Sequence, residues 1–126
     1  MKITFTKMQA LGNDYIYVDC FKQKLASINL SDLAKKMCDR HFGVGADGLI
    51  LVVPGRSHRF RMVFFNPDGT EAEMCGNGIR CFARFLYDQG LSKRKLQSIE
   101  TKAGIIHTNL YKHFPKYIDS CMSSFW

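Results

Sequence analysis

The chain has 126 residues, of which 46% are apolar and 23% charged, and its formal net charge is +7 at pH 7. This length and composition indicate one globular domain with its own apolar core, and they exclude a disordered or fibrous chain. The basic residues lie in small separate groups along the sequence and form no single stripe, so we expect no nucleic-acid partner.

The N-terminus contains no apolar segment of signal-peptide length, and the longest apolar run, LILVV at 49–53, is too short to span a bilayer. We therefore expect a cytoplasmic protein without a membrane partner. Five cysteines form an odd set without a C-x-x-C pair, which predicts free thiols and neither a disulfide framework nor a metal site: Cys20, Cys38, Cys75, Cys81 and Cys121.

The first half of the chain reads as strands around one short helix. KITFTKM predicts a strand, GND a turn and YIYVDC a second strand. NLSDLAKKMCDR predicts a helix with Ser31 as its N-cap residue, and GLILVVP and RFRMVFFN predict two more strands.

GVGADG at 43–48 matches G-x-G-x-x-G, but a dinucleotide fingerprint follows a strand and opens a helix. Here the order is reversed, so we predict a glycine-rich turn.

The second half contains a longer amphipathic helix, from about Asn77 to Gln89. Its apolar residues recur at helical spacing, and Gly90 stands where such a helix ends. The positions predicted to be buried are Ile79, Phe82, Ala83 and Leu86. LQSIET and GIIHTNL predict two late strands. Strands outnumber helices and follow one another as hairpins, which predicts an α+β fold with a mostly antiparallel sheet.

Cys75 lies at or just before the start of this helix, where unpaired N–H groups and the helix dipole favour an anion. That anion could be a reactive thiolate or a substrate carboxylate. Glycines at 76 and 78 would let a ligand approach the backbone closely. From the residues alone, a buried structural thiol remains as good an interpretation as a reactive one. Cys81 is six residues further on, points elsewhere, and is predicted to be a packed small hydrophobe.

The NPDG segment that precedes this cysteine fits a β-turn. Asn66 could point its carboxamide into the same pocket as Cys75, or it could cap its own turn. The local sequence favours the turn.

Three blocks of the chain, in order, resemble the diaminopimelate epimerase family. NPDGTEAEMCGNGIR (66–80) is similar to its signature Asn-x-Asp-Gly-Ser-x4-Cys-Gly-Asn-Gly-x-Arg, with Thr70 in place of Ser. FTKMQALGNDYIYVD and CDRHFGVGADGLILV resemble two further blocks, so the resemblance covers residues 1–106. This signature favours diaminopimelate epimerases over the proline racemase-like and phenazine-biosynthesis-like proteins that share their fold.

The resemblance implies a cofactor-independent epimerase that interconverts LL- and meso-diaminopimelate on the path to lysine, with one thiol on each face of the reacting carbon. It implies a fold of two similar halves, each with a sheet curled around a central helix and the substrate between them, and a possible homodimer. By the same resemblance Cys75 is catalytic, and the substrate-binding residues are Asn13, Asn66, Gly76 and Asn77. Ala46 stands where some members carry a substrate-contacting Gln, so that role is not transferred.

Members of the family are longer than this chain and take their second thiol from the second half. We predict an N-terminal family domain at 1–106 and a non-family tail at 107–126, from a truncated or frame-shifted product. Cys121 in this tail lacks a glycine-rich helix start, so we do not expect it to be the second thiol. Two functions follow: an epimerase half that is inactive alone, or a non-catalytic α+β remnant or binding module of the same fold.

Overall fold

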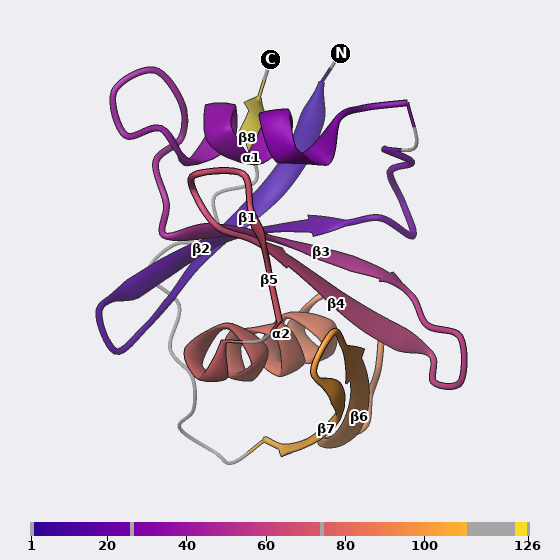
Figure 1. The fold of residues 1–126 in the computed structure, drawn as a ribbon. Helices are drawn as coiled ribbons and strands as arrows, with labels where there is room; N and C mark the ends of the chain where they lie inside the picture. The colour runs from indigo at the N-terminus through magenta and orange to yellow at the C-terminus, as the bar shows by residue number, and fades with distance from the viewer. Residues whose placement is uncertain (1, 26, 74, 111–122, 126) are drawn as a thin grey trace.

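The computed structural model describes residues 2–25, 27–73, 75–110 and 123–125. In this part of the chain a single eight-stranded sheet separates two helices (Figure 1). Helix α1 (Leu30–Cys38) covers one face of the sheet, and helix α2 (Gly76–Asp88) lies against the other. The predicted α+β class is confirmed.

The strands follow the order β7-β6-β4-β3-β2-β1-β8, with β5 beside β4. All neighbours are antiparallel except β2–β3 and β4–β6, which confirms the mostly antiparallel sheet. The bounds are β1 Ile3–Ala10, β2 Asn13–Asp19, β3 Gly48–Pro54, β4 Phe60–Phe65, β5 Glu71–Ala72, β6 Leu96–Thr101, β7 Gly104–Asn109 and β8 Ser123–Phe125.

Side chains of the central strands point alternately to the two faces of the sheet, which produces two apolar cores, one for each helix. On β2, Tyr15 and Tyr17 pack toward α2, whereas Ile16 and Val18 belong to the core beneath α1. Successive side chains of a strand point to opposite faces, so one buried strand contributes to both cores. This explains why YIYVD carries no polar alternation before Asp19.

Helix α2 is enclosed by the sheet on more than one side. All four positions predicted to be buried on this helix are at most 4% exposed. The β6–β7 hairpin bends around the helix (Figure 1), and Ile99 of β6 joins the same apolar core. The predicted central helix within a curled sheet is therefore confirmed.

The helix ends show one correct and one wrong prediction. Gly90 has a φ of +71°, and the N–H groups of Gly90 and Leu91 bond to the last carbonyls of α2, so the predicted glycine end is confirmed. At α1 the N-cap residue is Asn29, whose Oδ1 accepts from Asp32 N at 3.1 Å. The prediction of Ser31 was wrong because Asn caps equally well and Leu30 already packs against the core as a helical residue.

The GVGADG segment is a turn between α1 and β3, as predicted from the element order. Gly45 has a φ of +84°, which favours glycine. A Cβ at Gly43 would collide with the carbonyl oxygen of Lys36 on α1. These glycines let the chain fold back tightly from the helix into the strand.

Two expectations concern the end of the chain. Strand β7 runs through positions 106 and 107, and positions 111–122, with Cys121 among them, lie outside the described residues. The boundary between a family domain and a non-family tail therefore stays a prediction. Among the described residues, no helix is long and apolar enough to cross a membrane.

Replacing Phe82 with Ala tests the enclosure of α2. Phe82 is fully buried, so the substitution should lower the free energy of unfolding by about 3–5 kcal/mol, as for other core Phe-to-Ala changes. Urea denaturation measures the loss. The control is Tyr87→Ala on the same helix, where the residue is 41% exposed and the loss should be small. Equal losses for the two variants would contradict the described packing.

Candidate functional site

Cys75 is the N-cap residue of α2, directly before its first residue Gly76. Its backbone is extended (φ −132°, ψ 123°), its carbonyl accepts from Ile79 N at 2.8 Å, and its side chain makes no capping bond to the helix. Among the residues that the structure describes, none accepts a hydrogen bond from the N–H groups of Gly76, Asn77 or Gly78. An anion beside the Cys75 thiol would therefore meet, at the positive end of the helix, amides that donate to no other described residue.

The Cys75 thiol contacts a tyrosine from the neighbouring strand. Tyr15 Oη lies 2.8 Å from Cys75 Sγ, and either atom can be the donor. Tyr15 is 3% exposed, and its ring meets that of Phe64 edge-on, with centroids 5.7 Å apart. Burial, together with the hydrogen bond to Cys75, raises the pKa of Tyr15 above its ordinary value, so its phenol stays protonated.

A second tyrosine of β2 holds the first turn of α2. Tyr17 Oη donates to the Gly78 carbonyl at 2.7 Å, and the Tyr17 ring stacks on Phe85 with centroids 5.5 Å apart. A Cβ at Gly78 would lie 3.0 Å from Ile50 Cδ1, so any larger residue there would press on the Ile50 side chain. A Cβ at Gly76 would meet open space. Of the two glycines expected to admit a ligand, Gly76 fits that expectation, whereas Gly78 is buried.

The other described thiols have different surroundings. Cys20, Cys38 and Cys81 are at most 8% exposed, whereas Cys75 is partly exposed. Burial raises the pKa of Cys20 and Cys81 to about 11 and that of Cys38 to about 12. Cys81 is fully buried in the core around α2, which confirms its prediction as a packed small residue.

Strand register brings both candidate asparagines to one end of the sheet. Asn13 opens β2 on the face that carries Tyr15, two residues before it. In the register Tyr15 pairs with Gly48, and Leu49 pairs with Phe65, the last residue of β4. Asn66 follows Phe65, so it leaves the sheet at the end where β2 and β3 begin.

The Asn66 side chain closes its own turn, as the local sequence favoured. Its Nδ2 donates to Thr70 Oγ1 at 3.1 Å, and its backbone carbonyl accepts from Gly69 N at 2.9 Å. Ser31 Oγ donates to the Gly69 carbonyl at 2.8 Å, which ties the turn to α1. A contact between Asn66 and a substrate stays a prediction.

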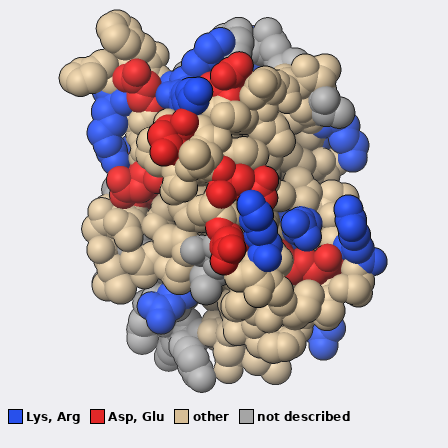
Figure 2. Space-filling view, viewed as in Figure 1, with Lys and Arg blue, Asp and Glu red and all other residues tan. Residues whose placement is uncertain are grey.

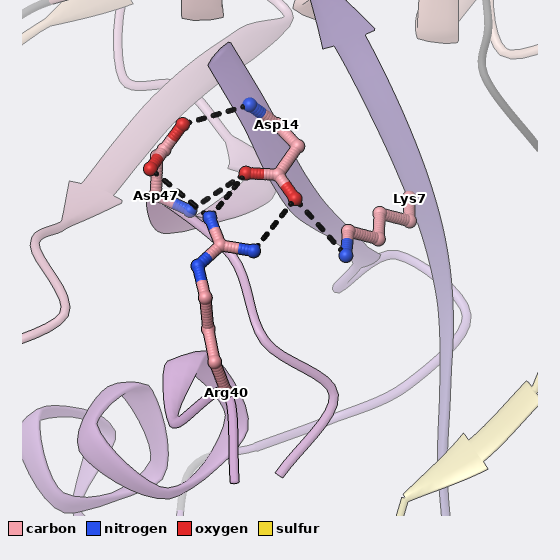
Figure 3. Close-up of polar contacts among 4 residues, drawn as sticks. All are labelled: Lys7, Asp14, Arg40 and Asp47. Carbon is pink, nitrogen blue, oxygen red and sulfur yellow. Dashed lines mark hydrogen bonds and ion pairs between the residues drawn. The ribbon is translucent and has the colours of Figure 1, made fainter. Parts of the chain in front are cut away.

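Four charged residues fix the start of β2 beside the loop that leads to β3 (Figure 3). Asp14 accepts from Lys7 Nζ at 3.0 Å and from Arg40 at 2.8 Å, and Arg40 also bonds to Asp47 at 3.1 Å. The backbone is tied as well, because Asp14 N donates to Asp47 Oδ2 and Asp47 N donates to the Asp14 carbonyl. We call these residues the Asp14 cluster, and they anchor the strand end that carries Asn13.

The Asp14 cluster escaped the sequence reasoning because Asp14 and Asp47 are 33 residues apart and meet only through the parallel β2–β3 pairing. Burial opposes ionisation of Asp14, but the bonds and charges of Arg40 and Lys7 outweigh it and hold the pKa of this carboxyl well below its usual range. On the face shown in Figure 2, basic and acidic side chains are interspersed.

The sequence profile of the diaminopimelate epimerase family matches residues 5–124. The chain belongs to the diaminopimelate epimerase family. A diaminopimelate epimerase of Pelotomaculum thermopropionicum is 57% identical over 102 residues, which are 81% of this chain and 36% of that relative. One of Acetivibrio thermocellus is 52% identical over 101 residues, which are 80% of this chain and 35% of the relative.

The fold of this family member also matches solved structures. A phenazine biosynthesis protein of Bacillus anthracis aligns with a TM-score of 0.62 at 25% identity, over 86% of this chain and 34% of that protein. The chain spans about a third of the length of the curated relatives it matches. This agrees with the expectation that it forms one part of a larger epimerase-like fold.

Thiol labelling tests the surroundings of Cys75. We expect iodoacetamide near neutral pH to modify Cys75 before the buried cysteines, because it is partly exposed at a helix N-terminus and burial favours the neutral form of the others. Peptide mapping by mass spectrometry identifies the first site, and Cys75→Ser is the control. Earlier labelling of Cys20 or Cys38 would contradict this arrangement.

Replacing Asp14 with Asn tests the Asp14 cluster. The pKa of Asp14 is lowered in the folded chain, so its contribution to stability is present above the unfolded value near 4 and is lost as the pH falls below it. Asp14→Asn should cost on the order of 1–2 kcal/mol at pH 7, and this difference should shrink toward pH 2.5.

Thermal unfolding of both proteins at the two pH values measures this effect. The control is Asp88→Asn, which breaks the i,i+4 pair with Arg84 and should cost less, about 0.5 kcal/mol. A loss for Asp14→Asn that is the same at both pH values would show that the ion pairs of Asp14 do not stabilise the fold.

Proposed function

We propose that this chain supplies one catalytic half of a cofactor-independent diaminopimelate epimerase, with Cys75 as the acid/base group on one face of the substrate α-carbon. The observation that carries the proposal is the partly exposed Cys75 thiol at the open start of α2, in a chain whose relatives are named diaminopimelate epimerases. The reaction would belong to lysine biosynthesis in the cytoplasm.

Inversion of an α-carbon requires a proton to leave on one face and another to arrive on the opposite face. In this scheme a thiolate takes the α-proton and becomes a thiol, while a thiol on the other face donates its proton to the carbon and becomes a thiolate. Cys75 performs either half, depending on the direction of the reaction. A positioned acid/base group next to the reacting carbon is the basis of such catalysis.

The negative charge that develops on the substrate needs electrostatic stabilisation. The amides of Gly76 and Asn77 at the start of α2 would hold the α-carboxylate, where the helix dipole also favours negative charge. We assign Asn13 and Asn66 to substrate binding because both lie at the same end of the sheet. Asn66 would then exchange its bond to Thr70 for one to the substrate.

The second acid/base group has no candidate among the described thiols. The other described thiols are buried, and burial raises their pKa, so none of them resembles Cys75. We assign the second thiol to the part of the relatives that this chain does not cover. That part would also close over the substrate and exclude water, which strengthens the stabilising dipoles. In such a complete enzyme a homodimer is possible.

Activity measurements test the proposal. The purified 126-residue chain should show no measurable epimerisation of LL-diaminopimelate, because only one of the two acid/base groups is placed. A chimera in which residues 1–106 replace the matching part of the Pelotomaculum relative should epimerise this substrate. A coupled assay of meso-diaminopimelate formation measures both proteins.

The matched control is the same chimera with Cys75→Ser, which should lose activity. A folded chimera without activity would contradict the proposal and favour a non-catalytic remnant or binding module. Turnover by the 126-residue chain alone that disappears in its own Cys75→Ser variant would show a second base within this chain.

A further inference from the structure

The hydroxyl of Tyr15 lies against the Cys75 thiol, and the proposed function assigns it no role. It reaches Sγ from β2 at 2.8 Å, while its ring is held by burial and by the edge-on contact with Phe64. The backbone of Tyr15 pairs with Met8 and Gly48 on its two sides. The hydroxyl is therefore carried by a rigid part of the sheet.

We propose that Tyr15 is the positioning residue of Cys75, holding the sulfur at the start of α2 and stabilising its thiolate by donating a hydrogen bond. This inference rests on the proposed function for its catalytic meaning, but its geometry does not. Tyr15 touches neither the substrate nor the reacting carbon in this account, and it acts only through the sulfur.

The chemistry of the two groups suits an acid/base cycle. A phenol hydroxyl both donates and accepts, so it can accept from the S–H of the thiol and donate to the thiolate. When Cys75 takes a proton, the Tyr15 hydroxyl reverses its role by rotation and keeps its own proton. Burial and the neighbouring sulfur disfavour the phenolate, so Tyr15 is no competing base. A phenylalanine at this position would offer neither bond.

The test is the pH dependence of Cys75 alkylation in the 126-residue chain and its Tyr15→Phe variant. Loss of one hydrogen bond to a charged group corresponds to about tenfold, so the midpoint of the labelling rate should move up by about one pH unit. At neutral pH the rate should fall only about threefold, because a more basic thiolate is also more nucleophilic.

Tyr17→Phe is the matched control, because it removes a hydroxyl from the same strand face that bonds to the Gly78 carbonyl and not to the Cys75 sulfur. Both substitutions should lower thermal stability, but only Tyr15→Phe should move the pH midpoint. An unchanged midpoint in Tyr15→Phe, or an equal shift in both variants, would overturn the proposal.

A second measurement needs no variant and covers the case in which Tyr15→Phe does not fold. In the unaltered chain, the ring resonances of Tyr15 should shift when Cys75 is alkylated, and those of Tyr17 should shift much less. Tyr15 ring resonances that do not shift when Cys75 is alkylated would also overturn the proposal. Both experiments report on the Cys75 thiol and not on turnover. The Tyr15 proposal can therefore fail while the epimerase proposal stands, and the epimerase proposal can fail while the Tyr15 proposal stands.

Discussion

The contact between β2 and the first turn of α2 is the constraint on which the rest of the site depends. Tyr15 reaches the Cys75 sulfur and Tyr17 reaches the Gly78 carbonyl, both from one face of the strand. Two hydroxyls spaced by two residues match the pleat of a strand and therefore meet the helix at two points. The Cys75 side chain makes no capping bond to the helix, so among the described residues no capping side chain competes with a ligand for the first amides.

The same strand also connects this helix start to the binding groups proposed around it. Its first residue is Asn13, and its second, Asp14, is tied to Lys7, Arg40 and Asp47 on the opposite face. The two faces of β2 thus have different roles. One face carries Asn13, Tyr15 and Tyr17, of which the two tyrosines pack against α2, and the other secures the strand to the loop before β3 (Figure 3).

Sequence reasoning succeeded where the signal was local. The apolar period of α2, the glycine at its end and the strand patterns each depend on neighbours within one or two turns, and the structure confirms them. It placed Cys75 at a helix start for the same reason. The wrong N-cap at α1 also has a local cause, since Asn29 and Ser31 both suit that role and the packing of Leu30 decides between them.

Sequence reasoning missed the contacts that depend on register. Nothing in YIYVD indicates that its two tyrosines meet a helix that begins 60 residues later. The Asp14 cluster likewise exists only because β2 and β3 run parallel. For Asn66 the local signal was correct, since its side chain bonds within its own turn. Nothing in the sequence distinguishes Gly76 from Gly78 either. The difference depends on Ile50 of β3, which lies close to Gly78, whereas the space beside Gly76 is open.

The most direct test of the central claim, that Cys75 exchanges a proton with the substrate carbon, uses the chimera in D2O. LL-diaminopimelate is supplied, and NMR follows the α-proton signals of substrate and product. A thiol exchanges its proton with solvent, so the account predicts deuterium at the inverted α-carbon of the product, and no such incorporation when Cys75 is replaced by Ala. Product that retains its original α-hydrogen, or incorporation that persists in the Cys75→Ala chimera, would contradict it.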